Sequence, residues 1–148
     1  MSESKIQFIS PEQTVDLRSR VLRPGQPLSA CHYENDNAPA TFHLGVLHNN
    51  EIISNGTFLQ QGHEKFSEAR YPYRLRGMAT DPAHQKKGYG RDIVIFALGE
   101  LKKRNSDLLW FNARTSAEGF YLSLGFEVIE NIFDIPGVGP HKVMYRWL

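Results

Sequence analysis

Cysteine is nearly absent from this 148-residue chain, because Cys31 is its only one. A single thiol cannot close an internal disulfide or build a cysteine-ligated zinc site, and so little cysteine is typical of a reducing compartment. Cys31 stands beside His32, but sequence neighbours rarely form a nucleophilic pair in space, so we interpret it as an ordinary loop residue. We expect a cytoplasmic protein without disulfides.

An excess of charge and a long apolar run are missing as well. Seventeen Lys and Arg oppose sixteen Asp and Glu, for a formal net charge of +1. No global basic field therefore favours nucleic acid or an anionic membrane as a partner. No run approaches the ~18 apolar residues of a membrane span, and the start MSESKIQFIS lacks an apolar core behind a basic end. We expect a soluble, unexported protein that binds neither membranes nor nucleic acid.

The six histidines show no spacing typical of metal ligands. No two of them share a helix face, and the chain offers no cysteine set to complete a site. We therefore predict no metal. The histidines are His32, His43, His48, His63, His84 and His141.

What the chain does contain is enough apolar sequence for one core. With 41% hydrophobic residues, residues 1–148 suit a single domain. Alternation, apolar periodicity and turn residues predict a β-α-β-β-β-α-β-α-β-β order. The predicted strands are 5–9, 41–47, 51–59, 73–80, 108–111, 126–135 and 142–148, and the predicted helices are 10–22, 90–104 and 116–124.

The segment from 73 to 111 gives the clearest structural prediction. Ile93, Ala97 and Leu101 recur every four residues and define one apolar helix face. The apolar run 108–111 is typical of a strand buried on both faces, and reaching it through a helix implies a parallel crossover from strand 73–80. Gly77 inside that strand indicates a bulge. The expected class is α+β, with a mixed sheet.

The loop Gln85-Lys86-Lys87-Gly88-Tyr89-Gly90, read QKKGYG, precedes this helix. The first N–H groups of a helix lack intrahelical partners and attract anions, and glycines let a phosphate approach them. Two glycines before a helix are also common as plain turn residues. The loop matches neither a P-loop nor a dinucleotide fingerprint, because it has no Gly-Lys-Ser/Thr and no third glycine. ATP binding is thus disfavoured.

Four segments together resemble the GNAT superfamily of acetyl-coenzyme A-dependent N-acetyltransferases. They are LRGMATDP at 75–82, QKKGYG at 85–90, NAR at 112–114 and FYLSLGF at 120–126. The resemblance implies a single-domain α+β GNAT-like fold, with a mixed sheet of about six to seven strands, mostly antiparallel, and about four flanking helices. It also implies a splayed parallel strand pair that forms the cofactor cleft.

The resemblance assigns roles to residues that spacing alone leaves open. Backbone groups of the central strand would pair with the coenzyme arm, the loop and helix start would hold its diphosphate, and a strand-end asparagine would bond the arm. These implied acetyl-coenzyme A contacts are Met78, Ala79, Thr80, Gln85, Lys86, Lys87, Gly88, Tyr89, Gly90, Arg91 and Asn112.

For the chemistry, the resemblance places Tyr121 where the family often has the group that protonates the departing thiolate, while a backbone N–H near Met78 would stabilise the oxyanion. A packed tyrosine with a satisfied hydroxyl is the plain structural alternative. The attacking alkylamine has a pKa of about 10.4, so its deprotonation at neutral pH costs about 4 kcal/mol and calls for a base.

Strand 73–80 contains no acid, so the base that some relatives carry there cannot be transferred. The remaining candidates lie in predicted loops or at a strand start, where an ordinary solvated group is the competing interpretation. They are Glu34, Asp36, Glu64, Glu68 and His141. His141 follows Gly139-Pro140, a segment resembling one group of bacterial relatives, and is our preferred acceptor-side residue.

We therefore expect an N-acetyltransferase that acts on a primary amine of a small molecule or protein. The missing central-strand acid keeps a second hypothesis open, a non-catalytic coenzyme A-binding module on the same fold. The acceptor is not readable, because the segments that would shape its pocket are irregular. A homodimer is compatible with the last strand, which is rich in Val143, Tyr145 and Trp147 and has the pattern to pair with a partner.

Overall fold

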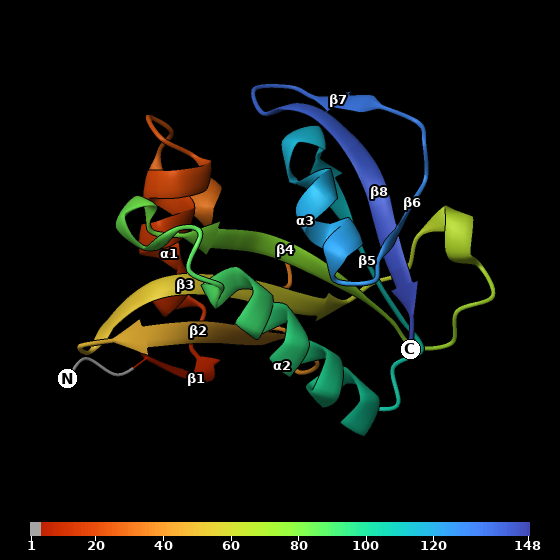
Figure 1. The fold of residues 1–148 in the computed structure, drawn as a ribbon, viewed down its shortest axis with the longest axis horizontal. Helices are drawn as coiled ribbons and strands as arrows, with labels where there is room; N and C mark the ends of the chain where they lie inside the picture. Colours follow the sequence, from red (N-terminus) through yellow and green to blue (C-terminus); the bar gives the residue numbers. More distant parts are fainter. Residues whose placement is uncertain (1–3) are drawn as a thin grey trace.

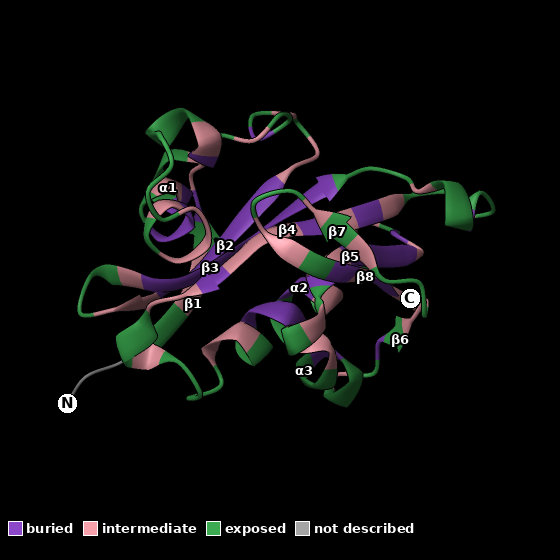
Figure 2. Cartoon of the chain, turned by 90° about the horizontal axis from the view of Figure 1, so that it is seen from above, coloured by how far each residue is buried: buried purple, intermediate pink, exposed green. Residues whose placement is uncertain are grey.

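The computed structural model describes residues 4–148, which form an eight-stranded sheet with helical segments on both faces (Figures 1 and 2). The strand order is β1-β2-β3-β4-β5-β8-β6, and β7 pairs with the start of β8. Among the strands of this described part, only β4 and β5 run parallel, as predicted. The strands are β1 Ser4–Ile9, β2 Phe42–His48, β3 Glu51–Gln60, β4 Pro72–Thr80, β5 Leu108–Arg114, β6 Glu127–Val128, β7 Phe133–Ile135 and β8 Gly139–Trp147.

Three α-helices occur in this part of the chain, against the prediction of about four, and short 3-10 and π segments account for the rest of the helical backbone. They are α1 Val15–Leu17, α2 Tyr89–Lys103 and α3 Glu118–Ser123. A capping box precedes α1, since Ser10 N–H donates to Gln13 Oε1 at 2.8 Å and Gln13 N–H donates to Ser10 Oγ at 3.3 Å. None of the described helices combines the length and apolarity needed to cross a bilayer.

The main core lies between the sheet and α2, with α3 beside it. Ile93, Ala97 and Leu101 are fully buried there, as their four-residue spacing predicts. In Figure 2 the buried residues run along the central strands, with α2 and α3 on one face of the sheet and α1 on the other. The two faces therefore have different environments, which matters for the site below.

One predicted strand, 126–135, is wrong, because the structure divides it into β6 and β7. Glu130, Asn131 and Ile132 between them are exposed, so no burial holds these residues in the sheet. β8 begins at Gly139 instead of 142, because Gly139 and Pro140 pair with β7. With this division the sheet has eight strands, where six to seven were predicted.

The prediction that the last strand could pair with a partner molecule is also weakened. β8 is an inner strand, with β5 along one edge and β6 and β7 along the other. Its backbone is therefore largely used within the chain. A homodimer stays a prediction without support from this strand.

Candidate functional site

The parallel strands β4 and β5 separate after a short common stretch. Their register covers only Pro72 with Leu108, Tyr73 with Leu109 and Arg74 with Trp110, although β4 continues to Thr80. In Figure 1 the two strands open like a V, with α3 beside the opening. Beyond Arg74, the β4 edge that faces β5 therefore carries backbone groups that no strand pairs.

A bulge in β4 accompanies this separation. The register with β3 shifts between Asn55 and Thr57, opposite Gly77, whose φ is +65°. Such an extra residue bends a strand and increases its twist. The glycine predicted to mark a bulge does so, and β4 turns away from β5 near this point.

A cavity of about 310 Å³ opens between the separated strands. β4 and β5 form the walls of this cavity. The segment after α1 and the β7–β8 turn form its rim. Its lining residues are Leu22, Arg23, Tyr33, the β4 residues 74–78, the β5 residues 111–114, Ala117, Tyr121, Ile135, Val138 and His141.

Four of the predicted site residues meet in this cavity, namely Met78, Asn112, Tyr121 and His141. Ala79 and Thr80 lie further along β4 and do not line it; Ala79 is buried, and Thr80 Oγ1 lies 2.8 Å from Ser54 Oγ. The predicted loop residues 85–91 follow at the start of α2.

The loop before α2 has the geometry of an anion site. Gly88 caps the helix with a φ of +89°, and a Cβ added there would meet nothing within 4 Å. The first intrahelical bond runs from Asp92 N–H to Gly88 O at 3.0 Å, so the N–H groups before Asp92 are free of helical partners. Gln85 Nε2 donates to Thr80 O at 3.2 Å and ties the loop to the end of β4.

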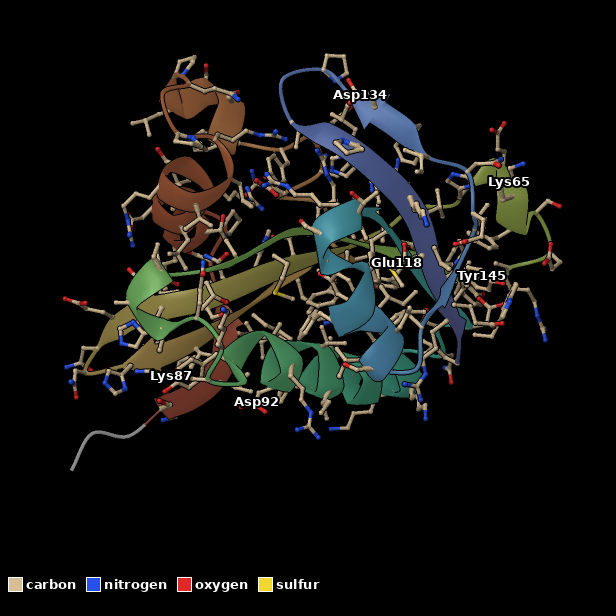
Figure 3. All side chains as sticks on the ribbon, turned by 45° about the horizontal axis from the view of Figure 1, so that its top comes forward. Lys65, Lys87, Asp92, Glu118, Asp134 and Tyr145 are labelled. Atoms are coloured by element: carbon tan, nitrogen blue, oxygen red, sulfur yellow. The ribbon has the colours of Figure 1, made fainter. Side chains whose placement is uncertain are left out.

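Positive side chains surround these N–H groups. Lys86 and Lys87 are exposed in the loop and Arg91 is exposed in the first turn; Figure 3 shows Lys87 and Asp92 near the start of α2. Tyr89 differs from this set, because its hydroxyl accepts from Ser4 Oγ at 3.1 Å. Its side chain therefore packs toward β1, and only its backbone faces the anion site.

Tyr121 is enclosed by aromatic rings on the α2 side of the sheet. Its ring centroid lies 4.3 Å from Phe111 and 4.9 Å from Phe120. Its hydroxyl has no hydrogen-bond partner among residues 4–148, unlike the satisfied hydroxyl of the structural alternative. Burial raises the pKa of this phenol above its ordinary value of 10, so the group stays protonated at neutral pH.

His141 is buried on β8 and is held in one orientation. Its Nδ1 lies 2.7 Å from the carbonyl oxygen of Gly139, which can only accept, so Nδ1 carries a proton and donates. In the neutral ring, Nε2 then keeps its lone pair. A positioned imidazole with a free lone pair on a cavity wall can accept a proton from a bound amine.

The acidic candidates for the base do not reach the cavity. Asp36 is buried in an ion pair with Arg18 at 2.7 Å, and Glu34, Glu64 and Glu68 are exposed elsewhere. Residues 4–148 contain no group of three His, Cys, Asp or Glu side chains placed to hold a metal.

Sequence reasoning missed the arginines of the cavity. The arginines that line it are Arg23, Arg74, Arg76 and Arg114. Arg74 and Arg76 alternate with buried Tyr73 and Leu75 in a central strand. Charges at alternate positions of a strand predicted to be internal are the signal that could have found them.

The comparisons with known proteins agree with this geometry. A family model described as an acetyltransferase (GNAT) domain matches residues 40–128. A Bacillus subtilis protein named as an uncharacterized N-acetyltransferase, YitI, is 38% identical over 144 residues, which cover 97% of this chain and 96% of that protein.

Solved structures share the fold at low sequence identity. An aminoglycoside 6'-N-acetyltransferase complexed with coenzyme A superposes with a TM-score of 0.76 at 12% identity, covering 97% of this chain and 96% of that one. The ribosomal-protein-S18-alanine N-acetyltransferase of Escherichia coli superposes with a TM-score of 0.72 at 18% identity, covering 98% and 94%.

Proposed function

Because this chain belongs to the GNAT acetyltransferase family and is an acyltransferase, we propose that it transfers an acetyl group from acetyl-coenzyme A to a primary amine. The observation that carries the proposal is the separation of β4 from β5, which leaves unpaired β4 backbone beside a cavity lined by Tyr121 and His141. The aminoglycoside acetyltransferase that binds coenzyme A with the same fold supports the choice of donor.

The chain's own groups fit the donor in two places. The free N–H groups at the start of α2, with Lys86, Lys87 and Arg91 around them, suit the diphosphate of coenzyme A. The unpaired edge of β4 near Met78, Ala79 and Thr80 suits its amide-containing arm, which can pair with backbone as a strand would. Asn112, on the opposite wall, adds a side-chain amide for the same arm.

In the proposed reaction the amine nitrogen attacks the thioester carbonyl directly. A C–N bond forms, the C–S bond breaks, and the products are the N-acetylated amine and the coenzyme A thiol. The backbone N–H near Met78 stabilises the oxyanion, and His141 Nε2 accepts the proton that the amine loses.

Tyr121 acts on the leaving sulfur. Because burial raises the pKa of its hydroxyl, complete proton transfer to a thiolate of pKa about 8.5 is unfavourable. A hydrogen bond to the developing negative charge is favourable, however, and needs no phenolate. Tyr121 is thus a hydrogen-bond donor that stabilises the departing thiolate. The thiolate takes its proton in the end from solvent, to which His141 returns the proton that it accepted from the amine.

The donor site is tested by calorimetry with acetyl-coenzyme A. Gly88→Val should weaken binding at least about tenfold, because a side chain at this φ distorts the loop and blocks the approach to the N–H groups. Gly25→Val is the matched control, since Gly25 also has a positive φ of +78° and open space around it. Absence of binding to the folded wild type would refute the proposal, and equal affinity of both variants would refute the loop's role.

The chemistry is tested by release of free thiol. Tyr121→Phe should lower kcat about 100-fold with little change in donor affinity or stability, because the hydroxyl has no protein partner to lose. Tyr145→Phe is the control, because Tyr145 lies on β8 (Figure 3) and does not line the cavity. Unaltered turnover in Tyr121→Phe would remove this residue from the mechanism. Turnover with any amine would exclude a non-catalytic coenzyme A-binding module.

A further inference from the structure

Positive charge is concentrated on the wall of the cavity, although the whole chain is nearly neutral. Four arginines line the cavity, Arg23, Arg74, Arg76 and Arg114, and no aspartate or glutamate of residues 4–148 does. The formal charge of the lining is therefore +4, against +1 for all 148 residues. A charge imbalance confined to a cavity indicates the charge of its ligand.

Arg74 and Arg76 face the side of the sheet opposite α2 and its phosphate loop. Arg74 and Arg76 alternate with Tyr73 and Leu75, whose side chains join the core under α2. The guanidinium of Arg74 instead lies 4.9 Å from the ring centroid of Trp110, on the opposite face. Since the phosphate loop belongs to α2, the arginine side is left for the acceptor.

The two β4 arginines are held in place by aromatic rings. Arg76 lies over the ring of Tyr33 at 4.3 Å, and Arg18 lies over the same ring at 3.8 Å. Arg18 is itself fixed by its buried bidentate pair with Asp36, at 2.7 and 3.0 Å. A guanidinium stacked on a ring keeps its N–H edge free for a planar anion and loses little freedom on binding.

Neither β4 arginine has a carboxylate partner among the described residues. Arg74 has one side-chain partner, donating to Gln61 Oε1 at 3.3 Å, and its Nε is buried without any acceptor. Burial, and then the charge of Arg76, lowers the pKa of Arg74 to about 10, and burial also lowers the pKa of Arg76. Two partly buried like charges without a counter-ion are unfavourable, and a bound anion would relieve both.

We infer that the acetyl acceptor is a small amine that also carries a carboxylate or phosphate group, which Arg74 and Arg76 bind. The inference rests on the proposed acetyl transfer. The cavity volume of about 310 Å³ is at the small end of the ~300–1,000 Å³ of small-molecule sites. The same charges disfavour polyamines and other cationic acceptors. The inference therefore selects acceptors such as amino acids or phosphorylated amines.

The first test compares matched acceptors by thiol release at saturating acetyl-coenzyme A. The pairs are tyrosine with tyramine, phenylalanine with phenethylamine, and phosphoethanolamine with ethanolamine, with a diamine as the cationic case. In at least one pair, we expect the member with the acidic group to have a kcat/KM about tenfold or more above the partner that lacks it. The pair that shows this preference tells whether the site binds a carboxylate or a phosphate. Equal values within every pair, or a preference for the members without an acidic group or for the diamine, would overturn the inference.

The second test removes one arginine at a time. Arg76→Gln and Arg74→Gln should raise KM for the preferred anionic acceptor about 10- to 100-fold, while acetyl-coenzyme A affinity in calorimetry stays unchanged. KM for the partner that lacks the acidic group should hardly move. Arg70→Gln, which changes an exposed arginine outside the cavity, is the control. An equal effect on both members of a pair would show a structural role only and overturn the inference.

A binding measurement distinguishes a failure of this inference from a failure of the proposed acetyl transfer. Calorimetry with N-acetyltyrosine and N-acetyltyramine, the products of one pair, reports the anion contact without turnover. Tighter binding of N-acetyltyrosine or of N-acetylphosphoethanolamine, lost in Arg76→Gln, supports the inference, and no preference among these products contradicts it. Failure of acetyl-coenzyme A binding would instead refute the proposed acetyl transfer.

Discussion

Replacing Asp36 by asparagine should destabilise the fold by about 3–5 kcal/mol, the cost of breaking a buried ion pair from one side. The side chains of Arg18 and Asp36 are 0% and 6% exposed. Arg18 donates to both carboxylate oxygens, and Tyr33 N–H donates to Oδ2 at 3.0 Å. Asparagine keeps one acceptor oxygen and turns an NH₂ group toward these donors, so the buried charge of Arg18 loses its counter-ion.

This loss converts to a fall in Tm of roughly 10–20 °C for a domain of this size. Urea unfolding at pH 7 measures the change directly. Asp16→Asn is the matched control, because Asp16 also pairs with an arginine, Arg20 at 2.9 Å, but with side chains 71% and 45% exposed. A surface pair of this kind contributes less than about 1 kcal/mol. If Asp36→Asn cost no more than Asp16→Asn, the reasoning would be refuted.

The same pair predicts a pH dependence. Burial acts to raise the pKa of Asp36, but the hydrogen bonds and charge of Arg18, with Tyr33 N–H, outweigh it and hold the pKa below its usual 3.8. Because the folded pKa is depressed, the stabilisation is complete above the unfolded value and is lost as pH falls through the folded one. The stability difference between wild type and Asp36→Asn should therefore shrink below about pH 4.

Three further changes can be measured in the same urea assay. Gly77→Ala should cost about 1–3 kcal/mol, because Gly77 has a φ of +65° and the added Cβ would lie 3.1 Å from the Tyr33 ring; a neutral result would contradict the bulge geometry. Gly99→Ala, in the exposed middle of α2 with nothing within 4 Å, should stabilise by about 0.5–1 kcal/mol, and a loss would show a contact that is absent here. Burial lowers the pKa of His43 below its usual 6.5. The stabilisation that the neutral buried ring gives to the fold is therefore complete above pH 6.5 and falls as the pH drops toward the folded pKa. The urea midpoint should decline over this range in wild type and less so in His43→Gln. Equal declines would rule out His43 as the source.

The features that the sequence predicts well are encoded by neighbouring residues. The repeat of Ile93, Ala97 and Leu101 defines a helix face locally, and all three side chains are fully buried under the sheet. The loop 85–90 and the glycine of the bulge are likewise short-range signals, since a positive φ or a helix start depends on a few residues. Such features need no knowledge of distant partners.

The features that the sequence does not reveal depend on contacts between distant segments. In the sequence Asp36 is one of several candidate bases in predicted loops, and nothing there indicates that the fold places it against Arg18. Thr57 completes the contact by accepting from Arg18 at 2.7 Å. These three residues come from separate parts of the chain, so no local pattern links them. The break in strand 126–135 likewise involves a distant segment, because β6 and β7 pair with separate parts of β8, at 144–145 and 139–141.

The bulge at Gly77 explains how one strand serves both sides of the proposed site. Before it, Tyr73 and Leu75 point into the core under α2 and Arg76 points to the opposite face, beside Tyr33. In an unbroken strand Met78 would share the face of Arg76, yet Met78 packs against the α2 core. The inserted glycine thus reverses the alternation by one residue. As a result, the residues before Gly77 present arginines to the acceptor side, and those after it continue along the α2 side toward the phosphate loop.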